Sequence, residues 1–278
     1  MSFPARGTGK DTKARSGKIL RALLRLLLVL ALAAAVYAGL RLWRIEREAA
    51  RSERLLQALR AEVFPSMRGD ASPGLSADTP PAQGGAHTCP VDWQALWARC
   101  PGAAAWLSGC GGEVDTPVMQ GADNIFYLTH LADGTENALG AAFLDSANRA
   151  NFADDQSFIF GHHAAGGRGA FAPLLNYRAQ DYFDAHPAFL LHTPQGCFAA
   201  EIFATCAAPG DFPYYTGEFS DTAARLQFLQ TMRASSDILS PTLPAADDRI
   251  LTLCTCVVKS GEGESLRYLV SARLTPLS

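Results

Sequence analysis

The segment Ile250-Leu-Thr-Leu-Cys-Thr-Cys256 and the later run Arg267-Tyr-Leu-Val270 decide the fold of the C-terminal part of this chain. Both are short and apolar, and a polar stretch with two glycines separates them. Two apolar runs around such a stretch predict a β-hairpin. With the turn centred between Gly261 and Glu262, paired residues have numbers that add up to 523, and 256 plus 267 is 523. Cys256 is therefore expected to face Arg267.

An opposed cysteine and arginine provide two parts of an acyl-transfer site. Side chains directly opposite each other on antiparallel strands have Cβ atoms about 4.5 to 5.5 Å apart, so the Arg267 guanidinium can reach an oxygen of an acyl group on the Cys256 sulfur. Such a site also needs a base, and His162 is the candidate. Arg273 lies on the same strand face but about 20 Å further along, which makes it the poorer choice. Taken singly, the cysteine and the arginine are also typical of a buried apolar position and a solvated surface position.

Short apolar runs bounded by Gly, Pro, Asp or Asn dominate the C-terminal two thirds of the chain. Such runs predict many short strands, and thus a mainly β domain built as a barrel or a sandwich. The runs are 124–129, 140–144, 157–160, 189–192, 197–206, 249–258 and 267–274. Two helices are expected, over 92–99 and over 221–232. The second is predicted to begin after a Ser220 cap and to present Leu226, Leu229 and Met232 on one face.

The N-terminal region predicts a membrane anchor. Leu26 to Leu40 carries no charge, and the apolar stretch extends over 19–43 if its arginines lie near the ends. About 20 helical residues cross the hydrocarbon core of a membrane. A cleaved signal peptide is the alternative, but arginines and Trp43 follow the apolar run where small residues of a cleavage site would be expected. A short basic tail before a large C-terminal domain favours a cytoplasmic N-terminus and an extracytoplasmic domain.

The chain is expected to divide into four parts. They are a cytoplasmic basic tail over 1–18, a single transmembrane anchor over 19–43, a helical stalk and Pro/Gly-rich linker over 44–90, and a folded domain over 91–278. Apolar residues recur at three-to-four spacing among Arg and Glu in the stalk, which is typical of a helix, and a solvated helix is the favoured interpretation. The last part has ample length to bury a core as one domain.

Composition and cysteine spacing argue against several kinds of site. The 24 Lys and Arg residues against 27 Asp and Glu give a net charge of -3, without a basic face, so no nucleic-acid partner is expected. The seven cysteines form no Cys-x-x-Cys pair, so no zinc ribbon is predicted, and neither a metal nor a cofactor is expected. The glycines of Gly166-Gly-Arg-Gly169 match neither a P-loop nor a dinucleotide fingerprint and are interpreted as a flexible loop.

Seven ordered segments together resemble a class B sortase, one of the membrane-anchored cysteine transpeptidases of Gram-positive cell walls. They are Trp106-Leu107, Val114-Asp-Thr-Pro-Val-Met-Gln120, Asp123-Asn-Ile-Phe-Tyr-Leu128, Gly140-Ala-Ala-Phe-Leu-Asp145, Phe160-Gly-His162, Leu251-Thr-Leu-Cys-Thr-Cys256 and Arg267-Tyr-Leu-Val270. The Thr-Leu-x-Thr-Cys ending is typical of sortases in general, whereas the Asp-Asn-x-x-Tyr-Leu segment is typical of class B. The resemblance implies a mainly β fold, a sortase-type closed β-barrel with an N-terminal helix and a helix inserted before the last two strands.

By this resemblance, Cys256 is the nucleophile, His162 the general acid/base and Arg267 the residue that stabilises the oxyanion. Contacts with a bound sorting signal are implied at five further positions, namely Asn124, Leu128, Tyr214, Cys254 and Thr255. The implied enzyme is a cysteine-type transpeptidase or hydrolase. It cleaves the C-terminal sorting signal of a secreted protein after Thr and, through a thioester, joins that protein to an amine of a peptidoglycan precursor. The family implies a single-pass protein of the cell membrane, held in the lipid by its anchor, with its catalytic domain outside the cell.

Cys254 is a departure from the family pattern. Class B sortases usually carry Ser two residues before the nucleophile, where this chain has Cys254. Residues two apart in a strand project to the same face, so Cys254 and Cys256 are both expected to border the active cleft. A second departure is Cys100-Pro-Gly, in place of the usual Asn-Pro-Asp.

Two other functions stay open. A pilus-polymerising or housekeeping sortase of another class would use a protein lysine or a different wall peptide as the acceptor, and the inserted helix argues against it. A catalytically silent module would bind sorting peptides without cleaving them, and the complete set of Cys256, His162 and Arg267 argues against it.

Overall fold

The structure is a computed structural model of the chain. It describes residues 9–65, 89–164, 166–209, 219–257 and 266–277, with the backbone alone for 9–22, 256 and 257. The chain forms two compact units, Met1–Glu48 and Ala49–Ser278.

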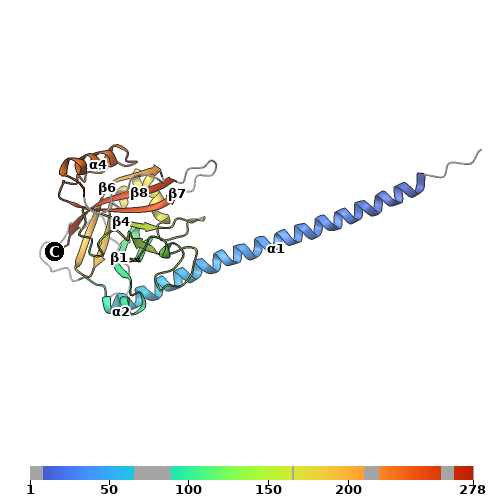
Figure 1. Ribbon diagram of the computed structural model, residues 1–278, viewed down its shortest axis with the longest axis horizontal. Helices are drawn as coiled ribbons and strands as arrows, with labels where there is room; N and C mark the ends of the chain where they lie inside the picture. Colours follow the sequence, from blue (N-terminus) through green and yellow to red (C-terminus); the bar gives the residue numbers. More distant parts are fainter. Residues whose placement is uncertain (1–8, 66–88, 165, 210–218, 258–265, 278) are drawn as a thin grey trace, which may run out of the picture. The chain divides into compact units, whose positions relative to one another are not determined.

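Eight strands in the described part of the second unit close into a barrel (Figure 1). Their order around the barrel is β1-β2-β3-β4-β7-β8-β6-β5. The strands are β1 (Ala103–Gly109), β2 (Val114–Met119), β3 (Ala142–Leu144), β4 (Gln156–Gly161), β5 (Ala188–Thr193), β6 (Gly196–Pro209), β7 (Arg249–Val257) and β8 (Leu266–Pro276). β3 pairs with β2, and β7 with β4, in parallel, and the other neighbours are antiparallel. The predicted mainly β fold with a closed barrel is confirmed.

The apolar runs located most of these strands but not all. The run 124–129 is not a strand, because it contains the 3-10 helix η3 (Phe126–Leu128). The Asp123 side chain accepts hydrogen bonds from the N–H groups of Ile125 and Phe126 at 2.9 and 3.0 Å, and such a turn competes with strand pairing. These two hydrogen bonds also lower the pKa of Asp123. β1 and β2 were not among the predicted strands, since an alanine run and a proline weaken the strand pattern.

Short helices accompany the barrel. They are α2 (Trp93–Arg99), η2 (Cys110–Gly112), η3, η4 (Ala172–Arg178), α3 (Gln180–Ala185) and α4 (Thr222–Ala234). α4 packs on β6 and precedes β7, so the helix predicted before the last two strands is confirmed (Figure 1). Its cap is Asp221, which accepts the N–H of Ala224 at 2.7 Å, and not Ser220. Leu229 and Met232 are buried as expected, whereas Leu226 is 39% exposed.

The N-terminal helix α1 (Gly9–Val63) contains the predicted anchor. Its large apolar side chains from Leu23 to Trp43 are exposed. This part of the helix is long and apolar enough to cross a membrane, which fits a membrane anchor.

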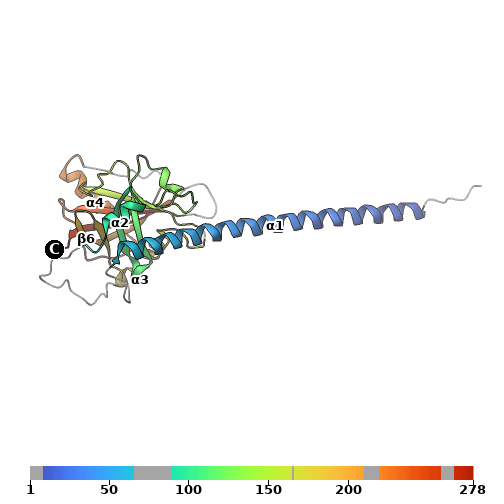
Figure 2. The same cartoon turned by 90° about the horizontal axis from the view of Figure 1, so that it is seen from below.

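The last turns of α1 belong to the core of the second unit. Leu59 and Val63 are fully buried, Leu55 is 8% exposed, and all three cluster with Leu96 of α2. An ion pair between Glu62 of α1 and Arg99 of α2, at 2.8 Å, joins the two helices, which lie side by side in Figures 1 and 2. The expectation of a solvated stalk is therefore wrong for these turns, because the spacing of four residues forms an apolar stripe that other parts of the unit cover.

Candidate active site

The β7–β8 hairpin pairs Cys256 with Arg267. The antiparallel register runs through nine consecutive pairs, from Arg249 opposite Leu274, without a bulge. In every pair the residue numbers add up to 523, so the register predicted from the turn is confirmed. Directly paired residues present their side chains on the same face of a sheet. The backbone therefore puts Arg267 beside position 256, where the side chain of the cysteine lies outside the described residues.

Arg273 is engaged at the other end of the hairpin. It pairs with Ile250, six residues along β8 from Arg267. Its Nε donates to Oε2 of Glu201 on β6 at 3.0 Å, and its Nη2 forms an ion pair with the same oxygen. An arginine held in this way neutralises a carboxylate and ties β8 to β6. These contacts support the preference for Arg267 as the residue near the cysteine.

Parallel pairing of β4 with β7 brings the backbone of His162 next to that of Cys256. The register ends at Gly161 opposite Thr255, and the next residue along each strand is His162 and Cys256, respectively. Neighbouring strands lie about 4.8 Å apart. Because β7 lies between β4 and β8, the backbones of His162 and Arg267 flank position 256 from its two sides.

A backbone carbonyl holds the imidazole of His162. The ring Nε2 lies 2.8 Å from the carbonyl oxygen of Leu128. A carbonyl oxygen only accepts hydrogen bonds, so Nε2 is the donor and carries a proton. A hydrogen bond of this kind selects both the orientation of the ring and its tautomer.

Two glycines determine how closely the surrounding chain approaches His162. A Cβ on Gly161 would come within 2.6 Å of the ring of Phe171, and a Cβ on Gly169 would come within 2.2 Å of the carbonyl oxygen of His162. The same carbonyl oxygen accepts the N–H of Phe171 at 3.1 Å. Gly169 also has a φ of +101°, which favours glycine. The segment Gly166–Gly169, interpreted from its sequence as a flexible loop, thus contacts His162 closely.

An exposed apolar surface lies beside His162. Ile125 is 70% exposed, Phe126 43% and Leu128 36%, and Leu128 supplies the carbonyl that holds the histidine. The neighbouring Asn124 accepts the N–H of Ser146 through Oδ1 at 2.8 Å, which ties this segment to the loop after β3. Isolated exposed apolar residues are ordinary, but a group of them next to a candidate acid/base indicates a binding surface.

The two residues before Cys256 are buried. Cys254 is 2% exposed and packs with Phe160, Leu269 and apolar residues of α4. The prediction that it borders an open cleft is therefore wrong. Strand alternation does give it the same face as Cys256, but the cluster covers that face at Cys254. Thr255 is 1% exposed, and its hydroxyl has no hydrogen-bond partner among the described residues. Tyr214, the remaining predicted contact, lies outside the described residues.

Sequence reasoning missed the contributions of Ile125, Phe126 and Gly169. Three apolar residues after an Asp–Asn pair were a usable signal, but they were assigned to a strand in which alternate side chains would be buried. The role of Gly169 had no local signal, because the atom it contacts is a carbonyl seven residues earlier in the chain.

Comparisons with known proteins identify the family of this chain. Sortase B from Listeria monocytogenes is 34% identical over 169 residues, which cover 61% of this chain and 68% of that protein. The chain belongs to the sortase B family. This is a family of cysteine transpeptidases, so the predicted family and the predicted kind of enzyme are confirmed. A sortase B from Staphylococcus aureus is 25% identical over 173 residues, which cover 62% of this chain and 70% of that protein. No family model matches the chain.

Solved structures of sortase B share the fold. The crystal structure from Clostridium perfringens has a TM-score of 0.60 at 25% identity and covers 66% of this chain and 98% of that chain. The Staphylococcus aureus sortase B-substrate complex has a TM-score of 0.62 at 20% identity and covers 86% of this chain and 98% of that chain. At 20% identity, the similarity to the Staphylococcus aureus structure concerns the fold alone.

Proposed function

We propose that this chain is a membrane-anchored transpeptidase that cleaves C-terminal sorting signals after Thr and transfers the released acyl group to a peptidoglycan amine. The observation that carries this proposal is the backbone arrangement of β4, β7 and β8, with Cys256 between His162 and Arg267. Membership of the sortase B family supports the general class of reaction.

The first step forms a thioester. The thiolate of Cys256 attacks the carbonyl carbon of the Thr in the sorting signal, and the carbonyl electrons move to the oxygen. Arg267 donates hydrogen bonds to that oxyanion, a charge that exists only in the tetrahedral intermediate and the transition states around it. The C–N bond then breaks, and His162 supplies the proton that the departing amine needs. The hydrogen bond from Nε2 of His162 to the carbonyl oxygen of Leu128 leaves Nδ1 as the ring nitrogen that transfers the proton.

The second step consumes the thioester. An amine of a peptidoglycan precursor attacks the acyl carbon and loses a proton to His162, the Cys256 sulfur leaves as the thiolate, and a new amide joins the substrate protein to the precursor. Water in place of the amine gives hydrolysis, which is why the enzyme has both transpeptidase and hydrolase character.

The sorting signal binds along the exposed segment beside His162. Ile125, Phe126 and Leu128 offer apolar surface there, and Asn124 lies at the start of the same segment. We further assign a contact with the signal to Tyr214, whereas the burial of Cys254 and Thr255 withdraws these two residues from the predicted contacts. The Staphylococcus aureus sortase B-substrate complex concerns that protein, but it supports a peptide site in this fold.

The membrane orients the enzyme toward its substrates. We propose that 1–18 is a cytoplasmic tail, that 19–43 crosses the lipid once, that 44–90 is a stalk and linker, and that 91–278 acts outside the cell. Secreted proteins with a sorting signal and the peptidoglycan precursor then meet on the outer side of the membrane.

Intact-mass analysis tests the proposed reaction. The full chain in detergent micelles is incubated with a pool of candidate sorting peptides, first without an acceptor and then with an amine-bearing cell-wall peptide or a lysine-containing protein peptide. We expect an acyl adduct on Cys256, its transfer to the wall peptide, and no adduct in Cys256→Ala. Binding without any adduct would favour the silent module, and transfer to the protein lysine alone would favour a pilus-polymerising enzyme.

A further inference from the structure

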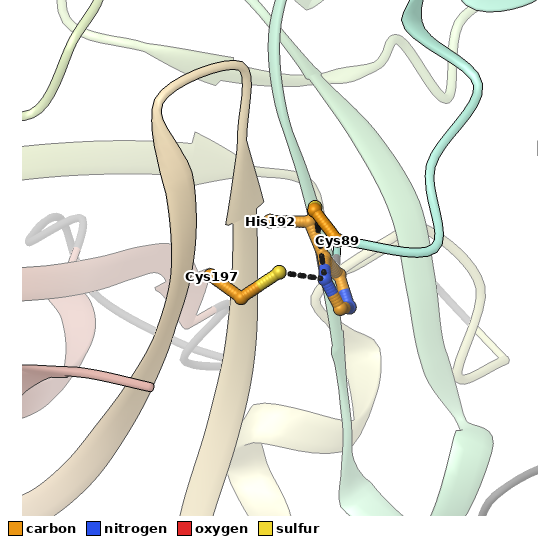
Figure 3. A group of neighbouring side chains, drawn as sticks. All are labelled: Cys89, His192 and Cys197. Carbon is orange, nitrogen blue, oxygen red and sulfur yellow. Dashed lines mark hydrogen bonds between the residues drawn. The ribbon is translucent and has the colours of Figure 1, made fainter. Parts of the chain in front are cut away.

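A second group of reactive side chains lies away from the proposed active site. The Sγ atoms of Cys197 and Cys89 lie 3.2 Å and 3.7 Å from Nδ1 of His192, and Figure 3 shows both cysteines against the imidazole. The three ligand atoms all lie within 4.8 Å of one another. His192 and Cys197 are each 6% exposed, whereas Cys89 is half-buried. The group is therefore sheltered but still reachable from solvent.

The fold fixes two of these residues before any ligand binds. His192 on β5 and Cys197 on β6 are directly paired across the β5–β6 hairpin. The ring of Phe64 packs edge-on against His192, with 6.2 Å between the ring centroids. Cys89, the first residue that the structure describes after 66–88, reaches the hairpin from more than 100 residues away in the chain.

Two sulfurs approach one nitrogen of His192, and the Sγ of Cys89 also donates to the carbonyl oxygen of Thr193 at 3.9 Å. Each nitrogen of an imidazole has one in-plane position, which holds either a proton or a lone pair, so Nδ1 makes one well-aligned hydrogen bond at a time. Here two sulfurs converge on the same nitrogen. In a tetrahedral zinc site, with Zn–S near 2.3 Å and Zn–N near 2.05 Å, the sulfur and nitrogen ligands lie ~3.6 Å apart. The observed separations of 3.2 and 3.7 Å lie on either side of that value.

We propose that Cys89, His192 and Cys197 bind a zinc-type divalent cation. Two thiolates and one imidazole are ligands that zinc prefers over the oxygen ligands of calcium or magnesium. The cysteines bind as thiolates, so their protons pass to solvent when the ion enters. The three side chains leave the fourth tetrahedral position to water or another small ligand. In a zinc ribbon, a Cys-x-x-Cys pair keeps two ligands close in the sequence. Here the fold brings the three ligands together instead, so the absence of such a pair does not argue against this site.

The ion stabilises the fold and takes no part in the acyl transfer. Along β6, Cys197 is eleven residues from Ala208, which pairs with Arg267. Eleven residues of strand span about 35 Å, so the cation lies far from the reacting atoms. The bound ion would join Cys89 to the β5–β6 hairpin. It would thus hold the segment that leads from position 89 into α2 against the barrel.

Cobalt and zinc binding to the full chain tests this site. The protein is purified in detergent micelles, reduced with a phosphine and stripped of metal with a chelator. Cobalt titration should give about one ion per chain, with the thiolate-to-cobalt absorption and the visible bands of a tetrahedral site, and zinc should displace the cobalt. Zinc should also raise the Tm. Cys89→Ser and Cys197→Ser should each weaken binding by at least about 10-fold, the lower end of what loss of even an outer-sphere partner costs.

Two further variants separate ligand loss from other effects. Cys256→Ala removes a thiol outside the group and should bind cobalt like the parent, whereas binding that disappears in this variant would place the ion at the proposed nucleophile and overturn the site. Cys89→His keeps a ligand and should bind with an altered spectrum, even if a serine at that position perturbs folding.

Three further results would overturn the proposal. They are no binding to the reduced chain, undiminished binding in the Cys89→Ser/Cys197→Ser double variant, and a Cys89–Cys197 disulfide in the chain as isolated, seen by peptide mapping and a mass two hydrogens lower. None of them bears on the acyl adduct at Cys256, so the two proposals fail separately.

Discussion

Gly169 lies against the backbone of His162, so close that a Cβ on the glycine would come within 2.2 Å of the histidine carbonyl oxygen. Gly169→Ala must therefore push the proposed acid/base away from its position beside Cys256. We expect kcat/KM for peptide cleavage to fall by about 100-fold, the cost of a displacement of roughly 1 Å at a reacting group. The measurement is steady-state cleavage of a sorting peptide by the purified full chain.

Gly167→Ala is the matched control for this change. Gly167 belongs to the same segment and also has a positive φ, +71°, but nothing lies within 4 Å of a Cβ at that position. Both variants thus carry backbone strain, and only Gly169→Ala adds a collision with His162. Equal losses of activity in the two variants would show that strain, and not the contact, matters.

Arg267→Ala should lose activity while the barrel stays folded. Removal of one oxyanion donor typically costs about 100 to 1,000-fold in turnover. Arg273→Ala is the comparison, because that arginine is bound to Glu201 at the other end of the hairpin. It should lower the Tm and leave kcat near that of the parent. A severe loss of kcat in Arg273→Ala, with near-normal Arg267→Ala, would contradict the assignment.

Cys254 should be unreactive in the folded protein. It is 2% exposed within an apolar cluster, so a small alkylating reagent added to the reduced native chain should modify Cys256 and leave Cys254 unmodified, as peptide mapping can show. Cys254→Ser should retain most transpeptidation, because Ser is the residue that class B sortases usually carry there, whereas Cys256→Ala should abolish it. Loss of activity in Cys254→Ser with retention in Cys256→Ala would reverse the choice of nucleophile.

Cys254→Ser should also lower stability. Burial of a hydroxyl group in apolar surroundings costs about 1–3 kcal/mol when it finds no hydrogen-bond partner. Cys254→Ala removes the sulfur without adding a polar group, so a comparison of the two variants by chemical denaturation separates these effects. A serine variant as stable as the parent would indicate that the hydroxyl finds a partner in this cluster.

Leu59→Ala should destabilise the second unit, because Leu59 is fully buried at the end of α1. Truncation of a buried leucine costs about 2–5 kcal/mol. Gln57→Ala, at an exposed position of the same helix, is the control and should change the free energy of unfolding by less than about 0.5 kcal/mol. By the same reasoning, a fragment that begins at 91 should unfold at a lower temperature than one that begins at 49.

Protease added to protoplasts that produce the chain should remove the domain and spare the tail before Ile19. The physical basis is the uncharged run from Leu26 to Leu40, which we propose crosses the membrane, and the short basic tail, which the positive-inside rule predicts on the cytoplasmic side. Antibody tags at each terminus report the two sides. A domain that resists protease until the membrane is dissolved would reverse the orientation.

The register of the β7–β8 hairpin was predictable from the sequence because it depends on local information. A short turn of known centre fixes which residues of two adjacent strands pair, and without a bulge this sets Arg267 opposite Cys256. The inserted helix and the apolar anchor were predictable for the same reason, since each depends on the periodicity of one continuous segment. The family motifs extended this prediction to the closed barrel.

Only the tertiary structure decided which distant segments meet. Parallel pairing of β4 and β7, which are separated by almost 90 residues, brings the backbone of His162 next to that of Cys256, and no turn connects parallel strands in a way that fixes their register. Cys254 is buried because α4 and its neighbours cover a face that alternation alone leaves open. Cys89 meets the paired His192 and Cys197 of the β5–β6 hairpin from more than 100 residues away, and contacts across such distances depend on packing between elements, which local patterns do not encode.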